Sequence, residues 1–175
     1  MIEPLDQDSI VILSTVYSEG GNSSPGAWAM ITNCILNRFV QGTNCDKLGH
    51  GFEWRGMNLI QICKTGFDGC KFATPSYREA FEYFSNRISQ APKPFFEEMI
   101  LTCHPIIKCD VLDNTGGATL YFSPKAQAAL HAKDPDQYKS VIPAWAKSDL
   151  VESVSVPNMQ SSDDFMVFKY KSKPA

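Results

Sequence analysis

The sequence YSEGGNSSPGAWAMITNCILNR, residues 17–38, organises the interpretation of the whole chain. A short apolar run precedes it, and the Gly20-Gly21 pair inside it can adopt the left-handed backbone that ends a helix. The pattern therefore predicts a helix at 9–19, a glycine turn and a second helix at 25–40, with Glu19 at the end of the first helix. The apolar face of the second helix recurs at helical spacing, with Trp28, Ile31, Ile35 and Phe39.

Glu19 is the candidate catalytic residue. At the C-terminal end of a helix the dipole disfavours a carboxylate, so the proton is held to higher pH. Tyr17 and Trp28 are close enough in sequence to exclude water from the same carboxyl. A carboxyl that stays protonated near neutral pH suits a general acid that protonates a leaving oxygen. The alternative, which the pattern alone favours, is a solvated residue at a helix end.

The segment resembles the opening signature of the SleB/CwlJ-type cell-wall hydrolases, the family of the spore-cortex-lytic enzymes. That signature is an aromatic or apolar residue, a small residue, Glu, a Gly-containing turn and a helix ending in Asn-Arg. Two further landmarks follow in the family's order, TGGATLY at 115–121 and Pro-Ala-Trp at 143–145. The resemblance extends over about 17–170. It implies an α+β, mainly helical, lysozyme-like domain, with Glu19 as the catalytic acid.

The chain departs from the family pattern at several positions. Ser23 stands where the family often has a second Glu, and Lys71-Phe72 replaces a common Gln-Phe. The terminal His-x-Phe-Tyr strand is Met-Val-Phe-Lys at 166–169, and the stretch at 46–70 is expanded. These differences concern substrate contacts more than the catalytic Glu.

Length and charge limit the class of protein. At 175 residues we expect one catalytic domain over 1–175, with a polar lead at 1–8 and a tail at 171–175. The net charge of −3 argues against nucleic-acid binding, and no apolar run reaches the length of a membrane span. The acidic start has no pattern of a Sec signal. An enzyme acting in the periplasm or cell wall would then need a phage lysis pathway or a specialised secretion system.

The even number of cysteines predicts disulfides in an oxidising compartment. The close pairs are Cys63/Cys70 and Cys103/Cys109, which leaves Cys34/Cys45. The alternative is that several are small buried thiols, Cys34 above all because it lies mid-helix. With no Cys-x-x-Cys motif and three scattered histidines, a zinc site is not expected, and no other metal or organic cofactor is implied.

The rest of the chain predicts further helices and a small antiparallel sheet. A hydroxyl residue followed by proline starts three helices, at Ser24, Thr74 and Ser123. Residues 42–71 are expected to be mainly loop, with a short helix or strand at 59–63. The remaining expected helices are 75–89, 95–102 (ended by His104-Pro105), 123–133 and 134–141. The expected strands are 118–122 and a hairpin of 150–156 with 165–170.

Five residues are candidate substrate contacts: Tyr17, Phe72, Thr119, Tyr121 and Trp145. Aromatic side chains on a loop can stack on sugar faces, although they also pin loops to a core. Alternation along a strand puts Thr119 and Tyr121 on one face, which we expect to be the cleft. Trp145 lines the groove or caps the core, and the core is the commoner place for a tryptophan.

The leading hypothesis is a lytic transglycosylase acting on the glycan strands of peptidoglycan. Glu19 would act as acid and then as base, closing a 1,6-anhydro ring on the muramic residue, so one carboxyl suffices. A second carboxylate facing Glu19 would permit hydrolysis instead. The candidates for it are Asp46, Glu53 and Asp68.

Two rival hypotheses come from other classes of protein. One is a peptidase or amidase using Cys34 and His104 as its thiol and base. The other is a non-catalytic module that binds wall glycan. Delivery as an antibacterial effector would add a further partner, a cognate inhibitor or immunity protein that plugs the cleft beside Glu19.

Overall fold

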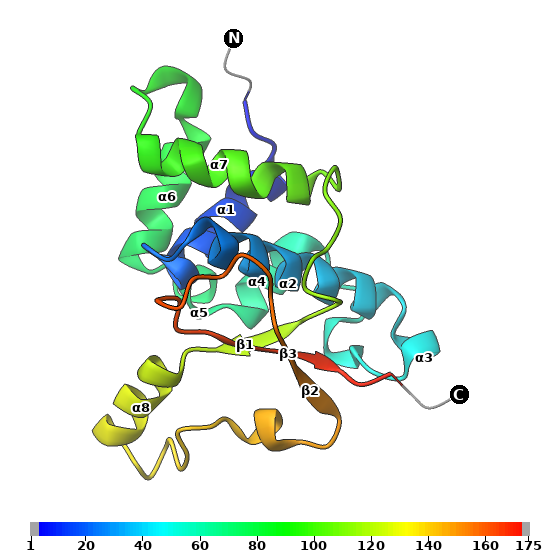
Figure 1. Ribbon diagram of the computed structural model, residues 1–175. Helices are drawn as coiled ribbons and strands as arrows, with labels where there is room; N and C mark the ends of the chain where they lie inside the picture. The colour runs from blue at the N-terminus through cyan, green and yellow to red at the C-terminus, as the bar shows by residue number, and fades with distance from the viewer. Residues whose placement is uncertain (1–3, 173–175) are drawn as a thin grey trace.

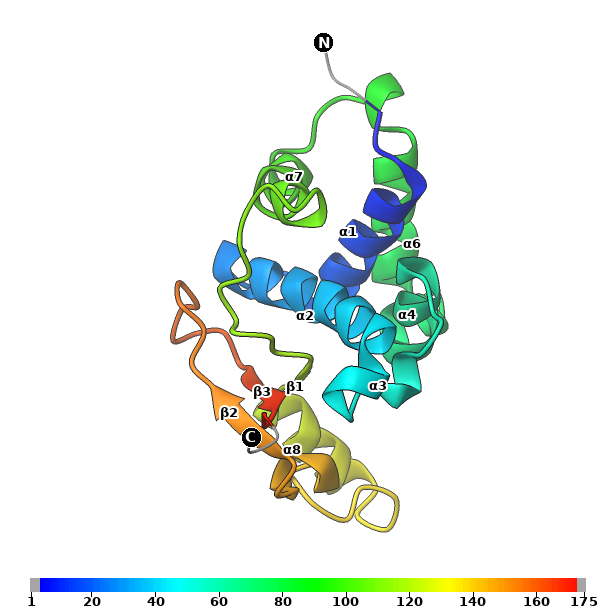
Figure 2. The same cartoon turned by 90° about the vertical axis from the view of Figure 1, so that its right-hand side faces the viewer.

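The computed structural model describes residues 4–172. Within them the chain is mainly helical with one three-stranded antiparallel sheet, which confirms the predicted α+β class. Most helices gather in one part of the molecule, and the sheet lies below them with α8 beside it (Figures 1 and 2). In chain order the longer helices are α1 (Gln7–Gly20), α2 (Pro25–Thr43), α4 (Leu59–Gly66), α6 (Pro75–Ser85), α7 (Pro94–Ile107) and α8 (Pro124–Lys133).

Helix α1 is the centre of the helical part. The Asp6 side chain caps its start by accepting from the Ser9 N–H at 2.8 Å, and Gly21 ends it with a φ of +48°. Every residue from 9 to 16 is buried, and the buried hydroxyls of Ser14 and Thr15 donate to the carbonyls of Ile10 and Val11 one turn earlier. Helices α2, α4, α6 and α7 surround it. The glycine turn and the two helices that meet at it are therefore as predicted.

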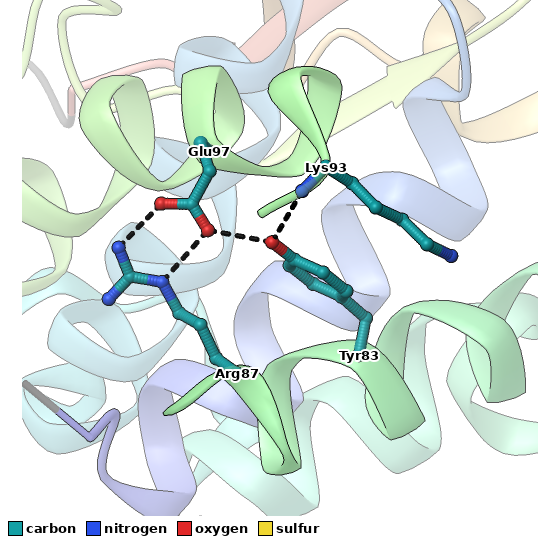
Figure 3. Close-up of polar contacts among 4 residues, drawn as sticks. All are labelled: Tyr83, Arg87, Lys93 and Glu97. Atoms are coloured by element: carbon teal, nitrogen blue, oxygen red, sulfur yellow. Dashed lines mark hydrogen bonds and ion pairs between the residues drawn. The ribbon is translucent and has the colours of Figure 1, made fainter. Parts of the chain in front are cut away.

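Helices α6 and α7 complete the core, and a polar cluster joins them (Figure 3). The Tyr83 hydroxyl donates to Glu97 at 2.7 Å, and the Arg87 guanidinium contacts the same carboxylate at 2.6 Å. Arg87 lies in a separate 3-10 turn, η2 (Arg87–Ser89), so the helix predicted at 75–89 ends early. The largest fully buried side chains include Trp28, Tyr83, Phe84, Ile12, Leu13 and Met30.

Pro105 does not end α7, contrary to the prediction. The helix continues through it to Ile107. Proline removes one backbone donor, whose acceptor would be the carbonyl of Leu101. Leu101 is 78% exposed, so that carbonyl lies on the solvent side of the helix, where water can replace the lost bond.

The segment at 42–71, predicted to be mainly loop, is a chain of short helices. It contains α3 (Cys45–Leu48), η1 (Phe52–Trp54), α4 and α5 (Asp68–Lys71). α4 confirms the short helix or strand expected at 59–63 as a helix, and a capping box starts it, in which Asn58 and Gln61 satisfy each other's backbone N–H groups. Trp54 anchors the segment to α2, where a Cβ on Gly42 would lie 2.3 Å from the Trp54 carbonyl oxygen.

The sheet contains β1 (Leu120–Phe122), β2 (Val151–Val154) and β3 (Met166–Tyr170), in the order β1-β3-β2. The predicted hairpin is confirmed, since β2 and β3 pair antiparallel with Ser153 opposite Phe168. β1 is shorter than expected and pairs with β3, with Tyr121 opposite Val167. The helix predicted at 134–141 is reduced to a single turn, in which the Tyr138 N–H donates to the Asp134 carbonyl at 2.9 Å.

All six cysteines lie in the described part of the chain, and all are free thiols. The predicted disulfides are therefore not present, and the alternative of buried thiols describes all but Cys109, which is exposed. Among residues 4–172, no helix is both long and apolar enough to cross a membrane.

Candidate functional site

Glu19 lies in the last turn of α1 and faces a pocket of about 360 Å³. One side, the helix wall, is formed by Glu19, Gly66 and Asp68. The opposite side, the sheet wall, comes from β1 and α8 and includes Tyr121, Ser123 and Gln127. The pocket therefore lies where the helical part meets the sheet, and its surface is mainly polar.

Two donors hold the Glu19 carboxyl. The Gly69 N–H donates to Oε1 at 3.2 Å, and the Tyr121 hydroxyl donates to Oε2 at 3.4 Å. Gly69 allows the close approach, because a Cβ there would lie 1.9 Å from the Ser18 Oγ. One donor comes from α5 and the other from β1, so the carboxyl is fixed between them.

The pKa of Glu19 is raised above its ordinary value. Burial is the main cause, and the negative charge of Asp68 adds to it. The Gly69 N–H, the Tyr121 hydroxyl and the Arg38 charge lower the pKa, but they do not cancel the rise. The predicted direction is correct, but Trp28 is directed elsewhere, since its indole N–H donates to the Gly21 carbonyl at 3.2 Å.

A row of amides on α2 positions the segment before Tyr121. Asn37 donates to the Ala118 carbonyl at 2.9 Å, and Gln41 donates to the Gly117 carbonyl at 3.2 Å. Asn33, one turn earlier, donates to the Asn114 side chain at 3.4 Å. These amides recur every fourth residue, which places them on one face of a helix. The spacing was visible in the sequence but was not used.

Two adjacent aspartates fix the helix ends around the sheet wall. Asp163 accepts from the Ser24 N–H at 2.9 Å at the start of α2, and Asp164 accepts from the Lys125 N–H at 2.8 Å at the start of α8. Hydrogen bonds from the Ser24 hydroxyl and backbone N–H lower the pKa of Asp163 against the opposing effect of burial. For Asp164 the hydrogen bond from Ser123 is the main cause of its lowered pKa. These carboxylates had no role in the sequence interpretation.

The structure brings only Tyr121, of the five predicted contacts, to Glu19. Tyr17 points away and packs edge-on against Phe96 with ring centroids 5.0 Å apart, because two positions along a helix turn the side chain by about 200°. Thr119 is fully buried, and within residues 4–172 its hydroxyl has no hydrogen-bond partner. Neither Tyr17 nor Thr119 lines the pocket beside Glu19.

Phe72 and Trp145 also lie outside the pocket wall. Phe72 follows α5 and is 65% exposed, with the Lys71 Nζ 5.0 Å from its ring centroid. Trp145 packs on Phe168, with ring centroids 5.4 Å apart, in a small second core cluster. The core position, which was the commoner alternative for Trp145, is the one observed.

Among the candidate second carboxylates, only Asp68 lines the pocket with Glu19. Asp46 forms an ion pair with Arg55, and Glu53 accepts from the Tyr170 hydroxyl at 2.8 Å. Asp46 and Glu53 therefore bind side chains outside the pocket, whereas Asp68 lines it.

The thiol candidate is in the wrong environment for a nucleophile. Cys34 is fully buried, and burial raises its pKa to about 12, whereas a nucleophilic cysteine needs a lowered pKa. His104 lies in the last turn of α7. Among residues 4–172, no three His, Cys, Asp or Glu side chains are arranged to hold a metal ion.

Compared with family models, curated proteins and solved structures, the chain matches none of them.

Proposed function

We propose that this protein cleaves the glycan strands of peptidoglycan as a lytic transglycosylase, and that its fold belongs with the lysozyme-like enzymes. One observation carries the proposal. A carboxyl, Glu19, is half-buried, has a raised pKa and lines a polar pocket. A raised pKa favours the protonated carboxyl, which is the form that a general acid needs. The proposed substrate is a sugar polymer that enters between the helix wall and the sheet wall.

The proposed reaction needs only this carboxyl. Glu19 gives its proton to the glycosidic oxygen that follows N-acetylmuramic acid, and the bond from that oxygen to the sugar C1 breaks. The resulting carboxylate is stabilised by the Gly69 N–H and the Tyr121 hydroxyl. It then takes the proton of the sugar's own 6-hydroxyl, whose oxygen bonds to C1 and closes the 1,6-anhydro ring. Glu19 ends the cycle protonated.

Hydrolysis is the second candidate, because Asp68 lines the same pocket. In this version Asp68 activates a water that attacks C1, and the product has a reducing end in place of the anhydro ring. The difference between the two reactions is one water in the product, which mass spectrometry resolves. A Cys34 peptidase is disfavoured by the burial of that thiol.

The compartment and partners belong to the same proposal. The site of action would be the periplasm or cell wall, reached through a phage lysis pathway or a specialised secretion system. In the effector version, an inhibitor protein would occupy the pocket beside Glu19. A search for a tightly binding protein encoded beside this one tests that version.

The deciding experiment is mass spectrometry of fragments released from purified peptidoglycan by the wild type and by Glu19→Gln. The matched control is Glu98→Gln, which makes the same change at an exposed position of α7. Anhydro-muropeptides from the wild type and the control, but not from Glu19→Gln, are expected. Fragments with reducing ends would indicate hydrolysis in place of transglycosylation, and cleaved peptide stems would indicate an amidase. Binding to sacculi without release would favour a non-catalytic module.

A further inference from the structure

Arg38 is a buried cation close to the site. It lies on α2 and is 8% exposed, and within residues 4–172 no ion pair includes it. Buried charges are usually compensated by an opposite charge or by hydrogen bonds. The groups around Arg38 therefore indicate the role of its buried charge.

The Arg38 hydrogen bonds join the two walls of the pocket. Its Nε donates to the Thr119 carbonyl at 2.8 Å, directly before β1. Its Nη1 donates to the Gly66 carbonyl at 3.2 Å, at the end of α4. Gly66 lines the helix wall, and Thr119 is two residues from Tyr121 in the sheet wall. One guanidinium thus fixes the spacing between the two sides.

Aromatic rings hold the guanidinium in place. Its central carbon lies 4.3 Å from the ring centroid of Phe67 and 5.5 Å from that of Trp54. Contact with ring faces stabilises a cation without neutralising it. The Phe67 ring is itself 6.2 Å from the Tyr121 ring, which contacts Glu19. The positive charge therefore remains available to groups at the pocket.

We propose that Arg38 is a positioning residue of the Glu19 site: through its bonds to the Thr119 and Gly66 carbonyls it sets the separation of the two walls, and it keeps a positive charge in the neighbourhood of Glu19 that favours the ionised carboxyl. The charged and titratable groups around Glu19 are Asp68, Tyr121 and Arg38. Arg38 is the one cation among them, and it lowers the pKa of both Glu19 and Tyr121. Burial and Asp68 oppose ionisation of Glu19, while Arg38 favours it. The proton can therefore leave Glu19 during the reaction and return afterwards.

The catalytic meaning of this inference rests on the proposed function, so the test needs a measurement that is independent of activity. We would titrate the Glu19 carboxyl by carbon NMR in protein with labelled glutamate. The same samples would give the pH profile of fragment release from peptidoglycan. The variants are Arg38→Gln, which removes the charge, and Arg38→Lys, which keeps it.

In Arg38→Gln, the Glu19 titration and the alkaline limb of the activity profile are expected to move to higher pH. The sign follows because a charge that lowers the pKa has been removed. In Arg38→Lys, the limb should stay near its wild-type position while the maximal rate falls, since an ammonium cannot reproduce the planar fork that reaches both carbonyls.

The matched control is Arg87→Gln, which removes an arginine whose guanidinium binds the Glu97 carboxylate between α6 and α7 (Figure 3). It should lower the melting temperature without moving the Glu19 titration. A folded Arg38→Gln with an unchanged Glu19 titration would overturn the proposal. If Arg38→Gln does not fold, Arg38→Lys decides, and wild-type rate and profile in that variant would overturn the positioning role.

An error in the proposed function can be distinguished from an error in the role of Arg38. Wild-type protein that releases no fragments would remove the peptidoglycan activity. The NMR titration of Glu19 would still show whether Arg38 controls its ionisation.

Discussion

Two glutamates in this molecule have the same kinds of neighbours and opposite properties. Glu97 accepts from the Tyr83 hydroxyl at 2.7 Å and from the Arg87 Nε at 3.0 Å (Figure 3). Hydrogen bonds from Arg87 are the main cause of its lowered pKa. Glu97 is thus held as a carboxylate that joins α6 to α7.

Glu19 also has a tyrosine and an arginine nearby, but the arginine donates elsewhere. Arg38 gives its hydrogen bonds to two carbonyls, and the Tyr121 hydroxyl is 3.4 Å from the carboxyl. Burial then dominates, and the pKa rises. The lesson is that the target of the guanidinium, rather than its presence, separates a structural carboxylate from a carboxyl that can exchange its proton.

Exchanging the two glutamates for glutamine should separate their roles most strongly. Glu19→Gln is expected to lower fragment release by about 10²–10⁴-fold, because the proposed general acid is lost while the amide can still accept from Gly69. Glu97→Gln should keep the activity and lower the free energy of unfolding by about 2 kcal/mol, since the charged hydrogen bonds are weakened. Release assays and urea denaturation check both. Full activity in folded Glu19→Gln would contradict the assignment.

Gly69→Ala removes the space that lets the backbone reach Glu19. The new Cβ would lie 1.9 Å from the Ser18 Oγ, so α5 must move away and the N–H bond to Glu19 is lost. We expect a loss of about 1–3 kcal/mol in stability and a large fall in activity. Lys71→Ala, at an exposed position of the same short helix, is the control. Unchanged thermal melting and activity in Gly69→Ala would show that the contact is unimportant.

Removing the hydroxyl of Tyr121 or of Tyr83 tests the same difference between Glu19 and Glu97, with a smaller expected effect. Tyr121→Phe takes away a donor that lowers the pKa of Glu19, so this pKa should rise further. The loss of about 1.4 kcal/mol of stabilisation of the carboxylate should reduce the rate about tenfold. Tyr83→Phe should lower stability and leave the pH–rate profile unchanged. A profile that moves in Tyr83→Phe would argue against the separation of the two clusters.

The two carboxyls should also give opposite slopes of stability against pH. Glu97 has a lowered pKa, so its contribution is present above the ordinary glutamate pKa and is lost as the pH falls through the folded value. Glu19 has a raised pKa, so the folded state loses stability as the pH rises from the ordinary value through the folded one. Urea denaturation of the wild type, Glu19→Gln and Glu97→Gln across a pH series measures the slopes. Parallel curves for all three proteins would contradict this.

The sequence predicted the parts that depend on local pattern. The turn at Gly20-Gly21, the helices around it and the β2-β3 hairpin follow from apolar spacing and turn residues. The raised pKa of Glu19 was predicted in direction. Its main causes, burial and Asp68, depend on a contact between residues far apart in the chain.

The remaining site residues could not be deduced from local pattern. Gly69 reaches Glu19 from α5, a short helix in a segment that was expected to be mainly loop. Tyr17 was misplaced because neighbouring residues in sequence were treated as neighbours in space, although they point to different sides of α1. Thr119 lies two residues before Tyr121, as the predicted alternation requires. Its side chain is fully buried, however, and does not reach the pocket.

The strand order has a consequence for how the protein is made. β3 is the last strand in the described chain, yet it lies between β1 and β2 and pairs with both. During synthesis the helical part with Glu19 emerges first, while β1 and β2 have no partner until β3 leaves the ribosome. A nascent chain would therefore contain Glu19 well before the Tyr121 side of the pocket has formed. The pocket beside Glu19 would be complete only after β3 has paired with β1.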